Sequence, residues 1–158
     1  MLIKKTHGSY KILNSKERKN ILKSIQEQWG CDIPVDDPIF LMNPKQKLFL
    51  TSRDIESLNL AEFRVDKIGT YFGMFDKNGL RLSIEGSQII GPCASKNVIE
   101  LNRDQIKDWL QGVNIDFKFD SNSFVIIKHD SDFMGCAKST GNVLMNFVPK
   151  ARRVKIID

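Results

Sequence analysis

Hydrophobic and polar positions are most clearly patterned near the C-terminal end of the chain. Residues 124–127 are all β-branched or aromatic, and residues 130–132 have the composition of a turn. Residues 134–139 then return with mostly small side chains around Gly135. This pattern predicts a β-hairpin, and Val143 to Val148 adds a further extended run.

A second pattern follows Pro149. In residues 153–156 a period of two places Val154 and Ile156 on one face and Arg153 and Lys155 on the other. The alternation predicts a closing strand that shows its charges to solvent or to a polyanion.

Hydrophobic residues in the N-terminal part first recur at helical spacing and then in short strand-like runs. Ile21, Ile25 and Trp29 recur at helical spacing after Ser15, which we expect to be the N-cap, and Gly30 ends the pattern. Residues 39–42 and 48–50 flank a turn and predict a hairpin, and a short helix is expected after Ser52.

Residues 63–84 are strand-like and divided by a turn at residues 77–79. A short helical piece ends at Ile90, and Gly91 with Pro92 marks the clearest break. Beyond it we expect a strand over residues 98–101, a helix capped by Asn102, and extended chain over residues 113–119. The pattern predicts an α+β protein with domains at 1–92 and 93–158, the second a small, partly closed barrel.

The composition limits the general class of protein to which the chain can belong. The 158 residues are 41% hydrophobic and 27% charged, an ordinary globular balance. No apolar run approaches the roughly 20 residues that a bilayer requires, and the three cysteines are dispersed. We expect a soluble, cytoplasmic protein without disulfides.

The net charge of +5 is concentrated at two ends. Residues 138–157 carry basic side chains and no carboxylate, and residues 4–23 carry one acidic residue, Glu17. Such segments suit a phosphate backbone, because each cation that neutralises a phosphate releases counterions. The competing interpretation is a solubilising surface.

We find no catalytic set. The glycines match no nucleotide-binding fingerprint, and His129 with Asp130 and Asp132 is better explained as a hairpin turn than as a cation site. Cys136 lacks an identifiable base and is expected in the core. The sequence predicts no catalytic residue, no metal and no cofactor, and therefore no enzyme.

The order of elements after Val98 resembles a PUA domain, the RNA-binding fold named after pseudouridine synthases and archaeosine transglycosylases. The residues that carry the resemblance are Gly135, Cys136, Ala137, Lys138, Ser139, Asn146, Pro149, Lys150, Arg152 and Arg153. The exit segment after Asn146 is similar to PUA modules of Sun-family RNA cytosine-methyltransferases.

Residues 69–75 with Arg81 and Leu82 resemble a two-domain family of archaeal and eukaryotic ribosome-biogenesis factors. Those proteins pair an α/β pre-PUA domain with a C-terminal PUA domain. The resemblance implies a pre-PUA domain over residues 1–92 and a PUA pseudo-barrel over residues 93–158.

The resemblance also implies a non-catalytic role in rRNA processing, ribosome assembly or RNA modification. Structured RNA, either rRNA or tRNA, is the expected partner, with an assembly factor or a methyltransferase docking on the first domain. The RNA-binding residues expected from charge and resemblance together are Lys128, Lys138, Lys150, Arg152, Arg153 and Lys155. Two alternatives stay open: a small RNA-modifying enzyme with a site between the domains, using Asp66, Glu85 or His129, and a protein–protein adaptor.

Overall fold

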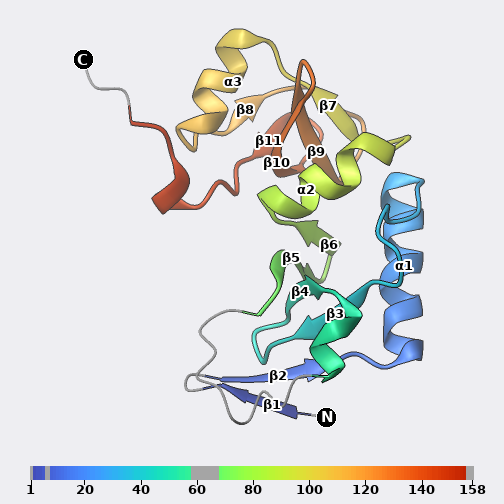
Figure 1. Ribbon diagram of the computed structural model, residues 1–158. Helices are drawn as coiled ribbons and strands as arrows, with labels where there is room; N and C mark the ends of the chain where they lie inside the picture. Colours follow the sequence, from blue (N-terminus) through green and yellow to red (C-terminus); the bar gives the residue numbers. More distant parts are fainter. Residues whose placement is uncertain (1, 6–7, 58–67, 156–158) are drawn as a thin grey trace.

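The computed structural model describes residues 2–5, 8–57 and 68–155, and shows an α+β fold with two sheets (Figure 1). One sheet has six strands and the other has five. The α+β class predicted from the sequence is confirmed. Within the described residues, no helix is long and apolar enough to cross a bilayer.

The first sheet follows chain order and is antiparallel throughout. Its strands are β1 (Leu2–Lys5), β2 (Gly8–Ile12), β3 (Ile39–Met42), β4 (Lys47–Thr51), β5 (Thr70–Asp76) and β6 (Gly79–Leu82), with a 3₁₀ turn η1 (Arg53–Ser57) after β4. The predicted hairpin at residues 39–50 is confirmed. Residues 63–67 of the predicted strand-like region lie outside the described chain.

Helix α1 (Ser15–Trp29) lies along this sheet (Figure 1). Its N-cap is Asn14 and not Ser15 as predicted: the Asn14 side chain accepts from the Glu17 N–H and the Glu17 carboxylate accepts in return from the Asn14 N–H. This reciprocal capping box outcompetes a cap one residue later. Gly30 ends the helix at φ 68°, a left-handed conformation that glycine adopts without steric cost.

The second sheet has the order β7-β9-β10-β11-β8. Its strands are β7 (Val98–Glu100), β8 (Ile115–Asp116), β9 (Phe124–His129), β10 (Asp132–Ser139) and β11 (Val143–Met145), with helix α3 (Arg103–Leu110) between β7 and β8. Strands β7 and β9 are parallel and the other pairs antiparallel. The predicted C-terminal hairpin is β9–β10, and the predicted helix capped by Asn102 is α3, so both are confirmed.

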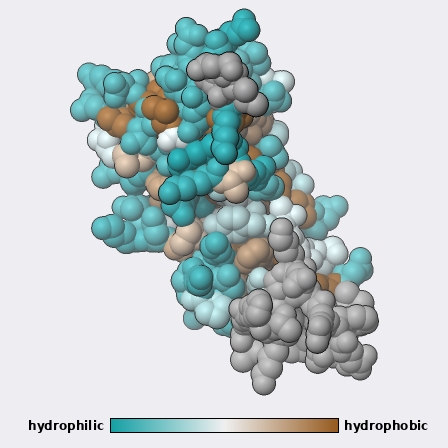
Figure 2. Space-filling model, turned by 90° about the vertical axis from the view of Figure 1, so that its left-hand side faces the viewer, coloured by the Kyte–Doolittle hydropathy of each residue, from teal (hydrophilic) through white to brown (hydrophobic). Residues whose placement is uncertain are grey.

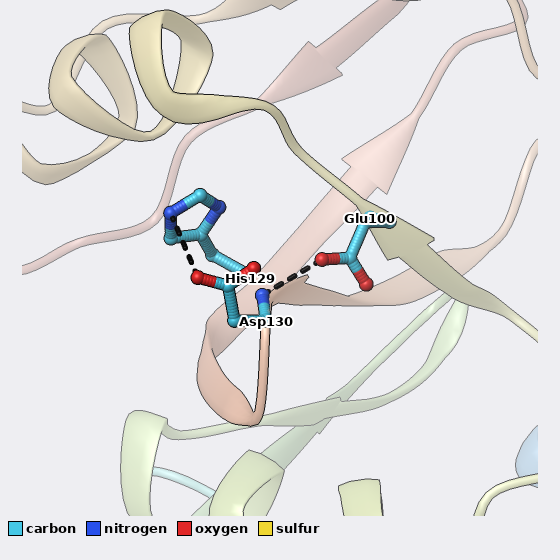
Figure 3. Close-up of side chains that lie close together, drawn as sticks. All are labelled: Glu100, His129 and Asp130. Atoms are coloured by element: carbon cyan, nitrogen blue, oxygen red, sulfur yellow. Dashed lines mark hydrogen bonds and ion pairs between the residues drawn. The ribbon is translucent and has the colours of Figure 1, made fainter.

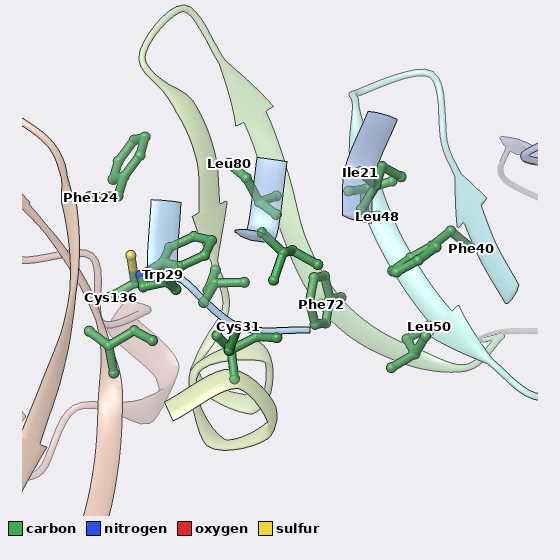
Figure 4. Packing of buried hydrophobic residues seen from close by; sticks show 14 of the residues in the cluster. Ile21, Trp29, Cys31, Phe40, Leu48, Leu50, Phe72, Leu80, Phe124 and Cys136 are labelled. Carbon is green, nitrogen blue, oxygen red and sulfur yellow. The ribbon is translucent and has the colours of Figure 1, made fainter. Parts of the chain in front are cut away.

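One apolar cluster joins the two sheets (Figure 4). Phe72 and Leu80 of the first sheet belong to the same buried group as Phe124 and Cys136 of the second, together with Trp29 of α1. Helix α2 (Ile84–Ile90) and the turn η3 (Gly91–Cys93) connect β6 to β7, and α2 contacts both β5 and β10. The predicted domain boundary at residues 92/93 stays a prediction, and the core runs across it.

The predicted closing strand over residues 153–156 is wrong in its described part. Lys150–Arg152 forms a 3₁₀ turn, η4, and the residues from Arg153 to Lys155 pair with no strand. Pro149 has no N–H to donate, and its carbonyl accepts from the Arg152 N–H at 2.8 Å. The Val154 N–H donates to Leu110 O at the end of α3, and the Val154 side chain is 53% exposed. The segment therefore follows a helix end instead of a sheet edge.

Candidate nucleic-acid interface

A groove of about 850 Å³ lies between the two sheets. One side comes from β4, β5 and β6, the other from β10, α3 and the segment after β11. Figure 2 turns the left-hand side of Figure 1 to the viewer and shows hydrophobic and hydrophilic residues intermixed on that face. The mixture suits a ligand with both apolar and charged parts.

The period of two in β6 explains why Arg81 faces this groove. Leu80 and Leu82 are buried in the cluster against α1, so Arg81 between them points to the opposite face of the sheet. On that same face Phe49 and Tyr71 are paired in the β4–β5 register, and their ring centroids are 5.6 Å apart. The β-side of the groove is therefore aromatic with a cation at its edge.

Phe147 forms the opposing side. It is 38% exposed, and its ring centroid lies 4.3 Å from the guanidinium carbon of Arg81 and 6.3 Å from the Phe124 ring centroid. This distance to Arg81 is within the range of a cation–π interaction. Phe147 thus links the two sheets across the groove.

Three cations and one carboxylate line the groove. Lys47 Nζ lies 5.3 Å from the Tyr71 ring centroid, and Arg152 forms an ion pair with Glu85. Burial raises the pKa of the Tyr71 hydroxyl, and the nearby Arg81 guanidinium partly offsets that rise. The groove therefore carries a net positive charge from described side chains alone.

The six RNA-binding residues expected from the sequence do not all lie at the groove. Arg152 lines the groove, and Lys150 is exposed in the same 3₁₀ turn. Arg153 is half-buried: its Nε donates to Val148 O at 3.1 Å, and its guanidinium lies so close to Gly112 that a Cβ there would come within 2.2 Å of Nε. Arg153 holds the C-terminal segment in place, and Lys155 is exposed beyond it.

Lys128 and Lys138 lie toward opposite ends of the β9–β10 hairpin. Lys138 pairs in register with Phe124, four residues from Lys128, which places the two backbones roughly 13 Å apart along the strand. Lys128 Nζ is 3.5 Å from a Glu100 carboxylate oxygen, and Lys138 Nζ donates to Asn122 O at 3.0 Å. The hairpin does not bring these two lysines together.

Sequence reasoning missed the aromatic side of the site. Tyr71, Arg81 and Phe147 were assigned no binding role, and Lys47 was not considered. The alternation around Arg81 was a usable signal, because it predicts a cation on the face opposite two leucines. Nothing in the sequence places Phe147 beside Arg81, since 66 positions separate them.

A second cluster of polar groups lies at the tip of the hairpin (Figure 3). Ligand atoms of Glu100, His129 and Asp130 lie within 4.8 Å of one another. Glu100 accepts from the Asp130 N–H at 2.7 Å and pairs with Lys128, while His129 Nδ1 bonds Leu101 O at 2.8 Å. These bonds fasten β7 to the turn between β9 and β10, which explains the cluster without a metal.

Cys136 is in the core, as the sequence predicted. Burial raises the pKa of its thiol to about 12, the opposite of what a nucleophile needs. The Cys31 thiol also has a pKa raised to about 12, first by burial and next by its contact with Cys93. Neither thiol is a thiolate near neutral pH.

Comparison with known proteins finds a family match in the second half of the chain. Residues 96–154 match the family described as the methyltransferase RsmF PUA domain. This match supports a PUA domain that resembles the modules of Sun-family methyltransferases, which confirms that part of the resemblance found in the sequence. The resemblance to two-domain ribosome-biogenesis factors stays a prediction.

The curated relatives are longer proteins. The ribosomal RNA small subunit methyltransferase F of Vibrio cholerae is 24% identical over 136 residues, which cover 85% of this chain and 28% of that protein. The enzyme of the same name from Aliivibrio fischeri is 21% identical over 150 residues, covering 94% of this chain and 31% of its own length. The similarity extends beyond the PUA match into the first sheet, and the chain spans about three tenths of these relatives.

Proposed function

We propose that this chain is a non-catalytic RNA-binding module that acts in the cytoplasm, in rRNA processing and ribosome assembly or in the modification of rRNA or tRNA. The observation that carries the proposal is the groove, where Lys47, Arg81 and Arg152 surround aromatic rings against one carboxylate, Glu85. Phosphates would contact the cations and fix the position of the RNA. The PUA match and the rRNA-modifying relatives support RNA as the ligand.

The basic C-terminal segment extends this surface. Lys150 and Arg152 share one 3₁₀ turn, with Lys155 exposed three residues further. The first sheet belongs to the part of the chain that the sequence assigned to a pre-PUA domain. We propose that an assembly factor or a methyltransferase docks on this sheet. Lys128 and Lys138 would contact RNA only where it extends along the hairpin.

The enzyme alternative finds less support in the groove. Glu85 is the one carboxylate among the described residues that line it, and it is paired with Arg152. His129 lies in the hairpin-tip cluster instead, and Asp66 lies outside the described residues. A carboxylate pair or a carboxylate–imidazole pair would need a second such group within hydrogen-bond reach, and the described residues that line the groove include none.

Salt-dependent RNA binding tests the proposal. The parent should bind a hairpin from small-subunit rRNA with an affinity that falls steeply as salt rises. The double variant Lys150→Ala with Arg152→Ala should bind more weakly and lower the slope of log K against log salt by about 2. Arg153 is left intact, because it anchors the segment.

The matched control is Lys16→Ala with Lys19→Ala, which removes two exposed cations from α1. It should keep most of the affinity. Equal losses in both double variants would show that net charge alone attracts RNA. A parent that retains no RNA in a filter assay at low salt would overturn the proposal and leave the protein adaptor.

A further inference from the structure

Phe147 is a partly exposed aromatic ring on the border of a positively charged groove. Among the described residues the exposed large hydrophobic side chains are Val113, Met145, Phe147 and Val154, so Phe147 is the aromatic one. The 38% of Phe147 that stays exposed would gain burial free energy if a ligand covered it. Phe147 borders the groove and is the natural place to look for such a ligand.

The groups around Phe147 select the chemistry of that ligand. The Arg81 guanidinium lies over the ring at 4.3 Å, and across the groove Tyr71 has Lys47 at 5.3 Å from its centroid. Aromatic rings and guanidinium planes both stack on nucleobases, and ammonium groups bind the adjoining phosphates. A neutral peptide would use the rings but would leave Lys47 and Arg81 without anionic partners, whereas Arg152 already pairs with Glu85.

The shape separates single strands from duplexes. The groove encloses about 850 Å³ between two sheets, within the range of sites that enclose a small ligand. In an A-form duplex the base faces are stacked on each other and cannot enter such a groove. An unpaired nucleotide can turn its base inward and leave its phosphates at the rim, near Lys47 and Arg152.

We propose that the groove between the two sheets binds an unpaired base of an RNA strand, stacked against Phe147 and Tyr71, with the flanking phosphates on Lys47 and Arg152. This inference rests on the proposed RNA-binding function and adds to it a preference for single-stranded elements. The groove reads the accessibility of a base and not the shape of a helix. Displacement of Glu85 by a phosphate would free Arg152 for the RNA.

Two RNAs of equal length and charge test the preference, one a hairpin with an unpaired loop and the other a fully paired duplex. Phe147→Leu keeps an apolar side chain and removes the ring. It should weaken binding of the looped RNA about tenfold, in line with the effect of losing one stacked base, and leave duplex binding unchanged. The control Met145→Ala, also exposed but outside the groove, should change neither affinity.

Photocrosslinking of the parent protein gives evidence that does not depend on a variant folding. An RNA with 5-iodouridine at one unpaired loop position should crosslink to a peptide containing Phe147 or Tyr71. The same label at a paired position should give no such product.

The possible outcomes distinguish failure of this inference from failure of the proposed RNA-binding function. Binding of looped and duplex RNA that Phe147→Leu does not alter, or a crosslink that maps to another face, would overturn the groove assignment while RNA binding stands. A parent that binds neither RNA would overturn both.

Discussion

The guanidinium carbon of Arg81 lies 4.3 Å from the centroid of the Phe147 ring. Arg81 belongs to β6 of the first sheet, and Phe147 follows β11 of the second. The groove therefore exists only when both halves of the chain are present and packed together. A fragment restricted to the PUA match at residues 96–154 would contain Phe147 and Arg152 but lack Tyr71, Arg81 and Lys47.

The Arg81–Phe147 contact predicts a difference between two substitutions. Arg81→Lys keeps the charge but loses the plane that stacks on a ring, so binding of looped RNA should weaken a few-fold with its salt slope unchanged. Arg81→Gln loses the charge as well and should lower the slope by about 1. Anisotropy titrations at several salt concentrations measure both. Identical behaviour of the two variants would show that the planar group has no role.

The side-chain amide of Gln28 in α1 makes two hydrogen bonds to the backbone of Leu80. Its Nε2 donates to Leu80 O at 2.9 Å, and its Oε1 accepts from the Leu80 N–H at 2.8 Å. Strand β6 ends the first sheet, so the amide side chain satisfies the groups that a further strand would otherwise pair. The backbone carbonyl of Gln28 accepts a further hydrogen bond from Asn97 Nδ2 at 2.6 Å, which ties α1 to the start of the second sheet.

Gln28→Ala should therefore destabilise the fold by about 2 kcal/mol, since it removes two hydrogen bonds and leaves a partly buried donor and acceptor unpaired. Urea unfolding followed by circular dichroism measures the change. Gln26→Ala, exposed on the same helix, is the matched control and should stay within about 0.5 kcal/mol of the parent. A similar loss in both variants would assign the effect to the helix and not to the edge strand.

Sequence patterns predicted helix ends and turns well where these depend on residues close to one another in sequence. Gly30 ended α1, Asn102 capped α3, and a turn at residues 130–131, within the predicted 130–132, joined β9 to β10, because each depends on neighbours in sequence. The closing strand failed because its alternation competed with a proline and with a hydrogen bond to Leu110, 44 positions away. Period alone does not reveal such a long-range partner.

The candidate site was predictable only in part for the same reason. Charge counting found Arg152 and Lys150, because a basic segment is visible in one stretch of sequence. It also selected Arg153, whose bond to Val148 O gives it a structural role. The aromatic half of the groove comes from strands and loops that meet only in the folded chain, so no local pattern marks Tyr71 and Phe147 as one site.

The buried thiol of Cys136 predicts a loss of stability at alkaline pH. Its pKa rises from an ordinary value of 9.0 to about 12 in the fold, chiefly through burial. Between those values the unfolded chain has lost the proton and the folded chain retains it, so the free energy of unfolding falls as pH rises. Below about pH 9 this contribution is fully present.

Urea unfolding at several pH values between about 9 and 11 tests this, with a slope of about −1.4 kcal/mol per pH unit expected from Cys136 alone. Cys136→Ala should reduce the slope by that amount, whatever its effect on stability at pH 7. Cys31 keeps its own contribution in both proteins, because its pKa is also raised to about 12. An unchanged slope in the variant would contradict the assignment of a raised pKa to Cys136.

The Glu85–Arg152 ion pair predicts a gain of affinity on removing a carboxylate. Glu85→Gln releases Arg152 and removes the one negative charge among the described groove residues, so RNA affinity at low salt should rise about three- to fivefold. Stability should fall by less than about 1 kcal/mol, because the Glu85 and Arg152 side chains are 37% and 48% exposed.

Glu27→Gln, which breaks an exposed ion pair on α1 with the same change in net charge, should leave the affinity nearly unchanged. In an Arg152→Ala background the gain from Glu85→Gln should shrink, because the freed cation is absent. An equal gain with and without Arg152 would mean that Glu85 acts only by repelling phosphates. A gain of the same size from Glu27→Gln would show that overall charge, and not the groove, sets the affinity.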